Sequence, residues 1–276
     1  MENDIDATLS ALKIKLFCDG ADLDGILSMY RYPWIRGFTT NPTLMRKAGI
    51  RDYEAFGRRL LAEVPDRPVS LEVFSDDLES MEVQARTIAT WGSNVNVKIP
   101  VTNTKGIFTG PLLRRLSADG IALNVTALTT LEQVTWVADA LDPNTPAIIS
   151  VFAGRVADTG IDPVPLMTAA VAAIGHRPMV ELLWASPREI LNLFQAESTG
   201  THIITATQDI LNKLSLVGKD LTEYSLDTVR MFYTDAMAAG FSIGSISNSV
   251  RHWTQHPDEL PSGTHRAVAL FSDAEA

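Results

Sequence analysis

Short β-rich runs alternate with longer segments of helical spacing along this chain, and that alternation restricts its fold more than any other feature. Parallel strands joined by crossover helices produce this pattern. After the fifth run we expect a helix that begins at Thr129 as N-cap, in a capping box with Glu132 three residues later. Eight strand–helix units close into a (β/α)8 barrel, the TIM barrel. The eight runs here cover residues 15–19, 35–39, 69–74, 94–99, 122–126, 147–152, 179–184 and 202–206.

An open, doubly wound α/β sheet is the alternative, because its strands and helices alternate in the same way. That fold usually has a glycine-rich phosphate loop after the first strand. The corresponding segment here, Cys18-Asp19-Gly20-Ala21-Asp22, contains a single glycine. We therefore predict one barrel domain over residues 1–244, with an additional C-terminal helix at 225–240, and a polar, loosely ordered tail at 245–276.

The net charge of −10 argues against polyanionic partners, because nucleic acids and anionic membranes bind clustered Lys and Arg. The acidic N-terminal sequence lacks the features of a secretory signal, and no apolar run approaches the roughly 18 residues that span a bilayer. We expect a cytoplasmic protein that binds neither nucleic acid nor membrane. The single cysteine, Cys18, cannot form an intrachain disulfide, and we expect a buried packing thiol here and not a nucleophile.

Polar residues stand where six consecutive strands of the predicted barrel end. In such barrels the C-terminal ends of the strands meet at one mouth, which holds the active site. A single polar residue at a strand end is ordinary, but six strands that each deliver one predict a common polar site. These residues are Asp19, Asn41, Glu72, Lys98, Asn124 with Thr126, and Ser150 with Arg155.

Lys98 is the most informative of them, because it lies within an apolar strand, Val95-Asn96-Val97-Lys98-Ile99-Pro100. Strand alternation turns Asn96 and Lys98 into the barrel and the apolar residues toward the helices. Burial lowers the pKa of an amine in general, and an uncharged amine is a nucleophile that forms a Schiff base with a carbonyl carbon. The alternative is a buried ion pair between Lys98 and Glu72 that has no chemical role.

Three segments resemble the transaldolase family, which includes the fructose-6-phosphate aldolases. They are Gly37-Phe38-Thr39-Thr40-Asn41-Pro42, Val97-Lys98-Ile99-Pro100-Val101-Thr102 and Ser150-Val151-Phe152-Ala153-Gly154-Arg155. Further similarity at 203–211 and 229–240 extends the resemblance over nearly the whole chain. The resemblance implies a (β/α)8 barrel that needs neither metal nor organic cofactor, cleaves a ketose, and holds a dihydroxyacetone unit as an enamine on a lysine.

The resemblance also implies a role for each polar residue. Lys98 is similar to the Schiff-base lysine, and Asp19 to the acid/base that takes the proton of the C4 hydroxyl. Glu72 and Thr126 would hold a catalytic water, as a positioned carboxylate beside an amine allows. Asn41, Asn124 and Ser150 would bind the hydroxyls of the dihydroxyacetone unit, and Arg155 a phosphate. The expected substrate-binding residues are Asn41, Thr40, Asn124, Ser150, Phe152, Arg155 and Glu181.

Two positions bear on the subclass. In this family, Phe in the sixth-strand motif goes with transaldolases, and Tyr with aldolases that use the phenol in proton transfer. Phe152 therefore favours transfer. Glu72 agrees, because the aldolases tend to carry Gln at that position. We therefore expect transfer of a dihydroxyacetone unit from a ketose or ketose phosphate to an aldehyde acceptor. The alternatives are a free aldolase and a sugar-binding barrel without turnover.

The seventh strand departs from the family pattern Ala-Ser-Phe-Arg, in which the Ser and the basic residue complete a phosphate site. Aligned on Glu189-Ile190, this chain reads Leu182-Leu183-Trp184-Ala185 there, so that Leu183 and Ala185 would replace both groups. Parity also turns Glu181 inward, near Arg155 or Lys98. The sequence thus predicts a ketose whose terminus differs from the usual phosphate. The alternative is that loop residues such as Lys105 restore phosphate binding.

The histidines do not predict a metal site. His252 and His256 have a spacing that suits metal ligands, but we expect a solvated tail at that point. We expect sugars or sugar phosphates as small-molecule partners, and leave a homo-oligomer open.

Overall fold

The computed structural model describes residue 9 and residues 11–243. Its strands form a closed barrel in sequence order, and every neighbouring pair is parallel. The predicted (β/α)8 barrel is therefore confirmed. The strands are β1 (Lys15–Asp19), β2 (Ile35–Thr39), β3 (Val69–Glu72), β4 (Val95–Pro100), β5 (Leu123–Leu128), β6 (Ala147–Val151), β7 (Val180–Trp184) and β8 (Ile203–Thr207).

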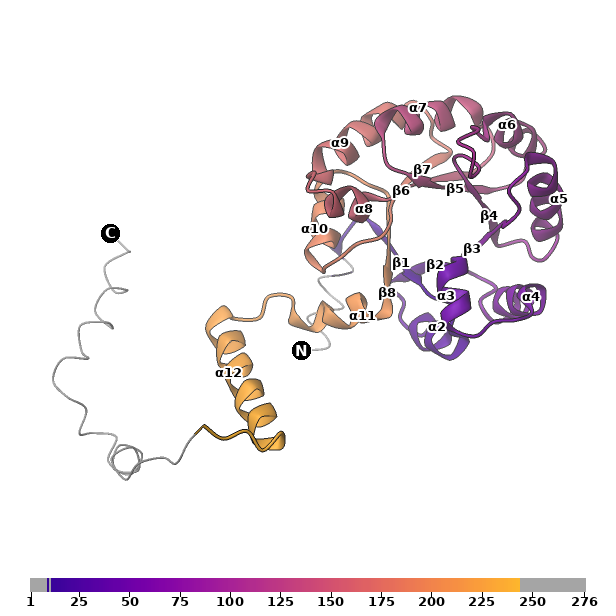
Figure 1. Cartoon of the computed structure of the whole chain (residues 1–276). Helices are drawn as coiled ribbons and strands as arrows, with labels where there is room; N and C mark the ends of the chain where they lie inside the picture. The colour runs from indigo at the N-terminus through magenta and orange to yellow at the C-terminus, as the bar shows by residue number, and fades with distance from the viewer. Residues whose placement is uncertain (1–8, 10, 244–276) are drawn as a thin grey trace, which may run out of the picture. The chain divides into compact units, whose positions relative to one another are not determined.

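Helices follow the strands and lie around the outside of the barrel (Figure 1). No helix in the described part of the chain is long and apolar enough to cross a membrane. The helices between β1 and residue 217 are α2 (Leu23–Tyr30), α3 (Pro42–Lys47), α4 (Tyr53–Glu63), α5 (Leu78–Ala89), α6 (Gly110–Ala118), α7 (Leu131–Ala140), α8 (Ala153–Asp158), α9 (Pro163–Ile174), α10 (Leu191–Ser198) and α11 (Gln208–Leu211), with the 3-10 helix η1 (Asn212–Leu216).

The chain divides into two compact units, Met1–Val217 with the barrel and Gly218–Ala276. The second unit contains α12 (Leu221–Ala238), so the helix expected at 225–240 is present but begins earlier in the chain. The predicted domain bounds remain a prediction. The tail at 245–276, with His252 and His256, lies outside the described residues.

The start of α7 differs from the prediction by one residue. Thr130, in extended conformation, is the N-cap, and its hydroxyl accepts from Gln133 N. The side chain of Gln133 in turn accepts from the backbone of Thr129 and Thr130. The expected pair Thr129 and Glu132 is therefore wrong, because the reciprocal contacts of a capping box need the residue three positions after the actual cap.

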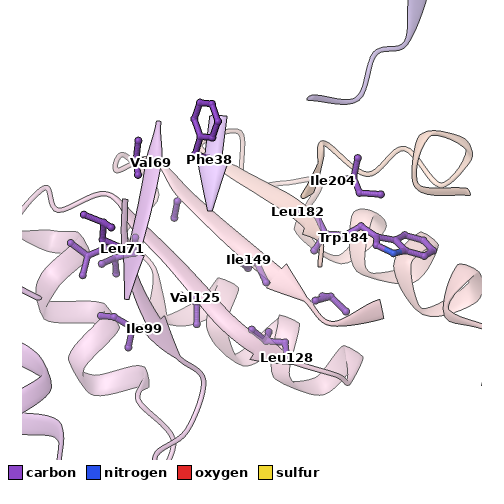
Figure 2. Packing of buried hydrophobic residues seen from close by; sticks show 14 of the residues in the cluster. Phe38, Val69, Leu71, Ile99, Val125, Leu128, Ile149, Leu182, Trp184 and Ile204 are labelled. Carbon is purple, nitrogen blue, oxygen red and sulfur yellow. The ribbon is translucent and has the colours of Figure 1, made fainter. Parts of the chain in front are cut away.

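An apolar core fills the space between the strands and the helices. Figure 2 shows Ile99, Val125, Ile149 and Leu182 of neighbouring strands within this core, and none of them is accessible to solvent. Burying a side chain of this size stabilises the fold by about 1.5–3 kcal/mol relative to exposure. The core therefore fixes the strands, and with them the inward-pointing residues that alternate with the apolar ones.

A separate apolar cluster lies inside the barrel. Gly37 makes room for it, because a Cβ atom on Gly37 would lie 2.5 Å from Phe17 Cζ. Phe17 and Ile148 border a cavity at the N-terminal ends of the strands, whereas Leu183 and Ala185 border one at the C-terminal ends. The cluster thus separates two polar ends of the barrel. Its buried members are Phe17, Ile148, Leu183, Ala185 and Ile203.

Candidate active site

Lys98 lies inside the barrel and pairs with Glu72 on the neighbouring strand. The register of β3 and β4 aligns the two residues, and Lys98 Nζ lies 3.1 Å from Glu72 Oε2. The ammonium group also donates a 2.9 Å hydrogen bond to the carbonyl oxygen of Thr40. The two side chains are only 8% and 16% exposed. The predicted inward orientation of Lys98 is confirmed, and the carboxylate is close enough to accept a proton from the amine.

Asp19 ends β1, and its carboxylate is held at both oxygens. Thr39 Oγ1 donates to Asp19 Oδ1 at 2.8 Å, and Asn41 Nδ2 donates to Asp19 Oδ2 at 3.3 Å. Burial raises the pKa of the Asp19 carboxyl, and the charge of Glu72 raises it further. The charge of Lys98 and the two hydrogen bonds oppose this rise. A carboxyl group whose pKa is raised exchanges its proton closer to neutral pH, as a general acid/base must.

The segment from Thr39 to Pro42 positions this carboxylate, because it joins β2 to α3. Asn41 is the N-cap of α3, where its Oδ1 accepts a 2.9 Å hydrogen bond from Leu44 N. Pro42 follows at the first helical position, where its missing N–H has no cost. Since the cap engages the amide oxygen, the amide nitrogen of Asn41 is turned toward Asp19.

A buried network of hydroxyl and amide groups lies beside the lysine. Asn124 Nδ2 donates to Ser70 Oγ at 3.0 Å, and Asn124 Oδ1 accepts from Ser150 Oγ at 2.6 Å. Thr40 Oγ1 donates to the carbonyl oxygen of Ser70 at 2.9 Å. Ser150 lines the cavity described below, whereas Thr40 and Asn124 do not. The expected contacts of Thr40 and Asn124 with a substrate therefore remain predictions.

Thr126 has a buried hydroxyl that makes no hydrogen bond with any described residue. It lines the same cavity as Glu72 and Lys98. The next residue, Ala127, has φ 67 and lies where the pairing of β5 with β6 is irregular. Non-glycine residues rarely adopt this left-handed conformation, and such irregularities re-aim the side chains of a strand end. The hydroxyl of Thr126 is thus available to a small polar molecule.

These groups line a cavity of about 540 Å³ at the C-terminal ends of the strands. Its wall also carries the cationic side chains of Lys47, Arg155 and Arg188. The ring centroid of Phe152 lies 5.5 Å from Arg155 Cζ, and the ring packs on the interior apolar cluster. The cavity brings together eight of the residues predicted from the sequence, namely Asp19, Asn41, Glu72, Lys98, Thr126, Ser150, Phe152 and Arg155.

Glu181 lies at the opposite end of the barrel. Its carboxylate accepts hydrogen bonds of 2.8 and 2.9 Å from Lys15 Nζ, and both residues border the cavity at the N-terminal ends of the strands. The prediction that Glu181 lies near Arg155 or Lys98 is therefore wrong. Parity turns Glu181 inward as expected, but it stands near the start of β7 and so in a lower layer than Leu183.

Ser186 and Arg188 border the cavity, although the sequence did not single them out. They follow the end of β7 in the order Ala185-Ser186-Pro187-Arg188, which agrees with the family pattern Ala-Ser-Phe-Arg except for the third residue. The matching segment thus lies three residues further along the chain than Leu182-Leu183-Trp184-Ala185, the segment that aligns on Glu189-Ile190. The prediction that Leu183 and Ala185 take the place of a serine and a basic residue is therefore wrong, whereas phosphate binding by Ser186 and Arg188 stays a prediction.

Gly154 brings the loop after β7 against the start of α8. A Cβ atom on Gly154 would lie 1.6 Å from the carbonyl oxygen of Ser186, so that no other residue fits without a shift of the backbone. Arg188 extends from this loop to Asp158, with Arg188 Nε 3.0 Å from Asp158 Oδ1. Arg155 follows Gly154 on α8. Two guanidinium groups thus border one cavity, and such groups suit the bidentate recognition of phosphate.

Cys18 is buried beside this site but is not equipped as a nucleophile. Burial and the charge of Asp19 raise the pKa of its thiol to about 12. The thiolate is the reactive form, so a thiol of this kind is inert near neutral pH. The expectation of a buried packing thiol is confirmed. Within the described residues, no group of three or more His, Cys, Asp or Glu side chains could hold a metal ion.

The sequence matches the family described as Transaldolase/Fructose-6-phosphate aldolase over residues 16–243. It is 33% identical over 202 residues to a probable transaldolase of Dehalococcoides mccartyi, with 73% of this chain and 90% of that protein covered. A probable transaldolase of Thermoanaerobacter sp. is 32% identical over 231 residues, which cover 83% of this chain and 100% of that protein. Probable transaldolase 2 of Listeria monocytogenes is 34% identical over 202 residues, with 73% of this chain and 88% of that protein covered.

Proposed function

Because the chain belongs to the transaldolase/fructose-6-phosphate aldolase family, we propose that it moves a dihydroxyacetone unit from a ketose phosphate to an aldehyde acceptor through a Schiff base on Lys98. One observation carries this proposal. A single cavity, at the end of the barrel where such folds carry their active sites, is lined by Lys98, Glu72 and Asp19. The Glu72 carboxylate lies 3.1 Å from the Lys98 amine.

In the first step the uncharged amine of Lys98 attacks the ketose carbonyl carbon. Glu72 accepts the proton that the ammonium must lose before attack, as its distance from the amine allows. Glu72 then returns this proton to the hydroxyl group of the carbinolamine, which leaves as water and gives an iminium ion. The hydroxyl of Thr126, buried and unbonded among the described residues, is suited to hold the water that leaves here and returns at hydrolysis.

In the second step the bond between C3 and C4 breaks. Asp19 takes the proton of the C4 hydroxyl, C4 becomes an aldehyde carbon, and the electron pair of the broken bond moves to the iminium to give an enamine. An aldehyde acceptor is then attacked by the enamine carbon, and Asp19 returns its proton to the new alkoxide. Hydrolysis of the resulting iminium releases the product ketose and frees Lys98.

A phosphate on the donor or acceptor would bind at Arg155 and Arg188, with Ser186 as a further donor. The arginines approach the cavity from α8 and from the loop after β7, and a dianion needs several such donors. This proposal replaces the altered sugar terminus expected from the sequence.

Release of free dihydroxyacetone is the second candidate function, and Phe152 favours transfer over it, because the phenylalanine ring has no proton donor. Two measurements test the proposal on the wild-type protein. Borohydride reduction in the presence of fructose 6-phosphate should attach a three-carbon unit to the peptide that contains Lys98. Incubation with fructose 6-phosphate and an aldose phosphate should give a new ketose phosphate. Free dihydroxyacetone in the absence of acceptor would favour the aldolase, and the absence of any adduct would refute both functions.

A further inference from the structure

Two buried threonines connect Asp19 to the strand on the far side of β1. Thr39 on β2 and Thr205 on β8 flank β1, and their hydroxyl oxygens lie 2.6 Å apart. Thr39 Oγ1 is also 2.8 Å from Asp19 Oδ1. Both residues are buried, and both also border the cavity that Lys98 and Glu72 line. Thr205, Thr39 and Asp19 thus form a chain of two consecutive hydrogen bonds that ends at the Asp19 carboxylate.

The direction of these bonds follows from the number of protons. An ionised carboxylate only accepts hydrogen bonds, so Thr39 uses its single hydroxyl proton for Asp19. Thr39 can then only accept in its contact with Thr205, which makes Thr205 the donor. A donor that is itself polarised by a second donor forms a stronger bond. Thr205 thus strengthens the bond to the ionised carboxylate without touching it.

The environment of Asp19 acts on the ionisation of its carboxyl group in opposing directions. Burial disfavours the ionised carboxylate, the charge of Lys98 on β4 favours it, and the charge of Glu72 on β3 disfavours it. The remaining charged residues that line one of the two cavities bordered by Asp19 are Asp22, Lys47, Arg155, Arg188 and Asp209.

We propose that Thr205 is a positioning residue that, through Thr39, orients the Asp19 carboxylate and favours its ionised form. This inference rests on the proposed function, in which the ionised carboxylate takes the proton of the substrate. Removal of the Thr205 hydroxyl should therefore make Asp19 easier to protonate and turn its oxygen away from the substrate hydroxyl.

The test is a titration of Asp19 in the full-length protein, labelled with ¹³C at the aspartate carboxyl carbon and assigned by comparison with Asp19→Asn. Thr39→Val should raise the Asp19 pKa by about one unit, the value of one hydrogen bond to a charged group. Thr205→Val should raise it by about 0.3 unit, because it removes only the strengthening of that bond. Thr205→Ser keeps the donor and should restore the wild-type value.

The chain offers a matched control in Thr201, which lies just before β8 and whose hydroxyl oxygen is 2.8 Å from that of Thr199. Thr201→Val breaks a similar buried threonine pair away from the site, and should leave the Asp19 titration unchanged. In the double variant Thr39→Val with Thr205→Val, the second change should add nothing, because the bond through which Thr205 acts is already lost. The acid limb of kcat/KM should move to higher pH in parallel with the titration.

An Asp19 titration in Thr205→Val identical to that of the wild type would overturn the inference. So would a shift of equal size in Thr201→Val or Thr205→Ser, or additive shifts in the double variant. The titration needs no turnover, so the proposed function can fail through the absence of a Lys98 adduct while the hydrogen-bond chain stands, and the reverse can also occur.

Discussion

Two inward-facing lysine–glutamate pairs lie at opposite ends of the same barrel, and their surroundings differ. Lys98 and Glu72, at the C-terminal ends of the strands, are 3.1 Å apart with side chains 8% and 16% exposed. Lys15 and Glu181, at the N-terminal ends, are 2.8 Å apart with side chains 48% and 33% exposed. Removal from water, and not the closeness of the pair, is what makes a lysine a candidate nucleophile.

The two ends also show that cavity size does not identify the site. The cavity at the N-terminal ends has about 580 Å³ and the one at the C-terminal ends about 540 Å³. Around the first, polar groups engage one another, since Tyr30 donates to Asp66 and Arg67 donates to the backbone of Tyr32. Around the second, the Thr126 hydroxyl makes no hydrogen bond with a described residue, and burial raises the pKa of Asp19. Chemistry and not volume thus distinguishes the two ends.

The sharpest test of this comparison substitutes the lysine of each pair. Lys98→Met should abolish the borohydride-trapped adduct and lower kcat by at least about 10³-fold, because Lys47, which also borders the cavity, is exposed to solvent and not buried beside Glu72. Lys15→Met is the matched control and should keep both the adduct and the rate. Mass spectrometry of the reduced protein and steady-state kinetics measure the two effects. A labelled Lys98→Met protein, or an unlabelled Lys15→Met protein, would contradict the assignment.

A second test concerns the arginines at the C-terminal end. Arg188→Ala or Arg155→Ala should raise KM for fructose 6-phosphate by about 10- to 100-fold, as the loss of a charge-assisted hydrogen bond of about 1.5–3 kcal/mol predicts. The rate with unphosphorylated fructose should change little. Arg36, which borders the cavity at the other end, provides the control Arg36→Ala. Equal losses for the phosphorylated and unphosphorylated sugars would show that the arginines do not bind the phosphate.

The barrel was predictable from strand periodicity, and the residues of the candidate site were predictable from their places at strand ends and from the resemblance to the family. Parity predicted that Lys98 and Glu181 point into the barrel, and each borders a cavity at one of its ends. The alternation of inward and outward residues repeats every two positions, so it does not distinguish the N-terminal end of a strand from its C-terminal end. That is why Glu181 was assigned to the wrong end.

Contacts between loops and the hydrogen bonds between strands were not predictable in this way. The segment with Ser186 and Arg188 can be matched to the family pattern in the sequence, but its contact with Gly154 appears only when α8 and β7 are in place. The contact of Thr39 with Thr205 joins residues 166 positions apart. Periodicity within a segment carries no information on which distant segments will meet.

A third test introduces a proton donor into the cavity at the C-terminal ends. Phe152→Tyr should raise the ratio of free dihydroxyacetone release to transfer by about tenfold, because a phenol can act as a general acid or base where the phenylalanine ring cannot. Phe152→Leu lacks a hydroxyl and serves as the control. Product analysis with and without an aldose phosphate gives the ratio. If the ratio stays unchanged in folded Phe152→Tyr, this residue does not decide between transfer and release.

The smallest effect is expected for Glu181→Gln, and it tests whether the apolar cluster isolates the two ends. The Lys15–Glu181 pair is half-exposed, and such pairs contribute about 0–1 kcal/mol to the free energy of unfolding. Urea denaturation should therefore show a loss of stability within that range. Kinetics should not change, because Phe17, Ile148 and their neighbours stand between Glu181 and the substrate.

Glu72→Gln makes the same substitution in the buried pair and should lower kcat by about 10²-fold or more, since it removes the base beside Lys98. The kinetics of Glu72→Gln and Glu181→Gln, compared with each other, therefore test whether the two ends of the barrel are independent. If Glu181→Gln altered kcat/KM for fructose 6-phosphate by more than about fivefold, about 1 kcal/mol of transition-state free energy, the ends of the barrel would be coupled. The apolar cluster would then have to transmit the change, and the N-terminal pair could no longer be regarded as a structural contact separate from the chemistry.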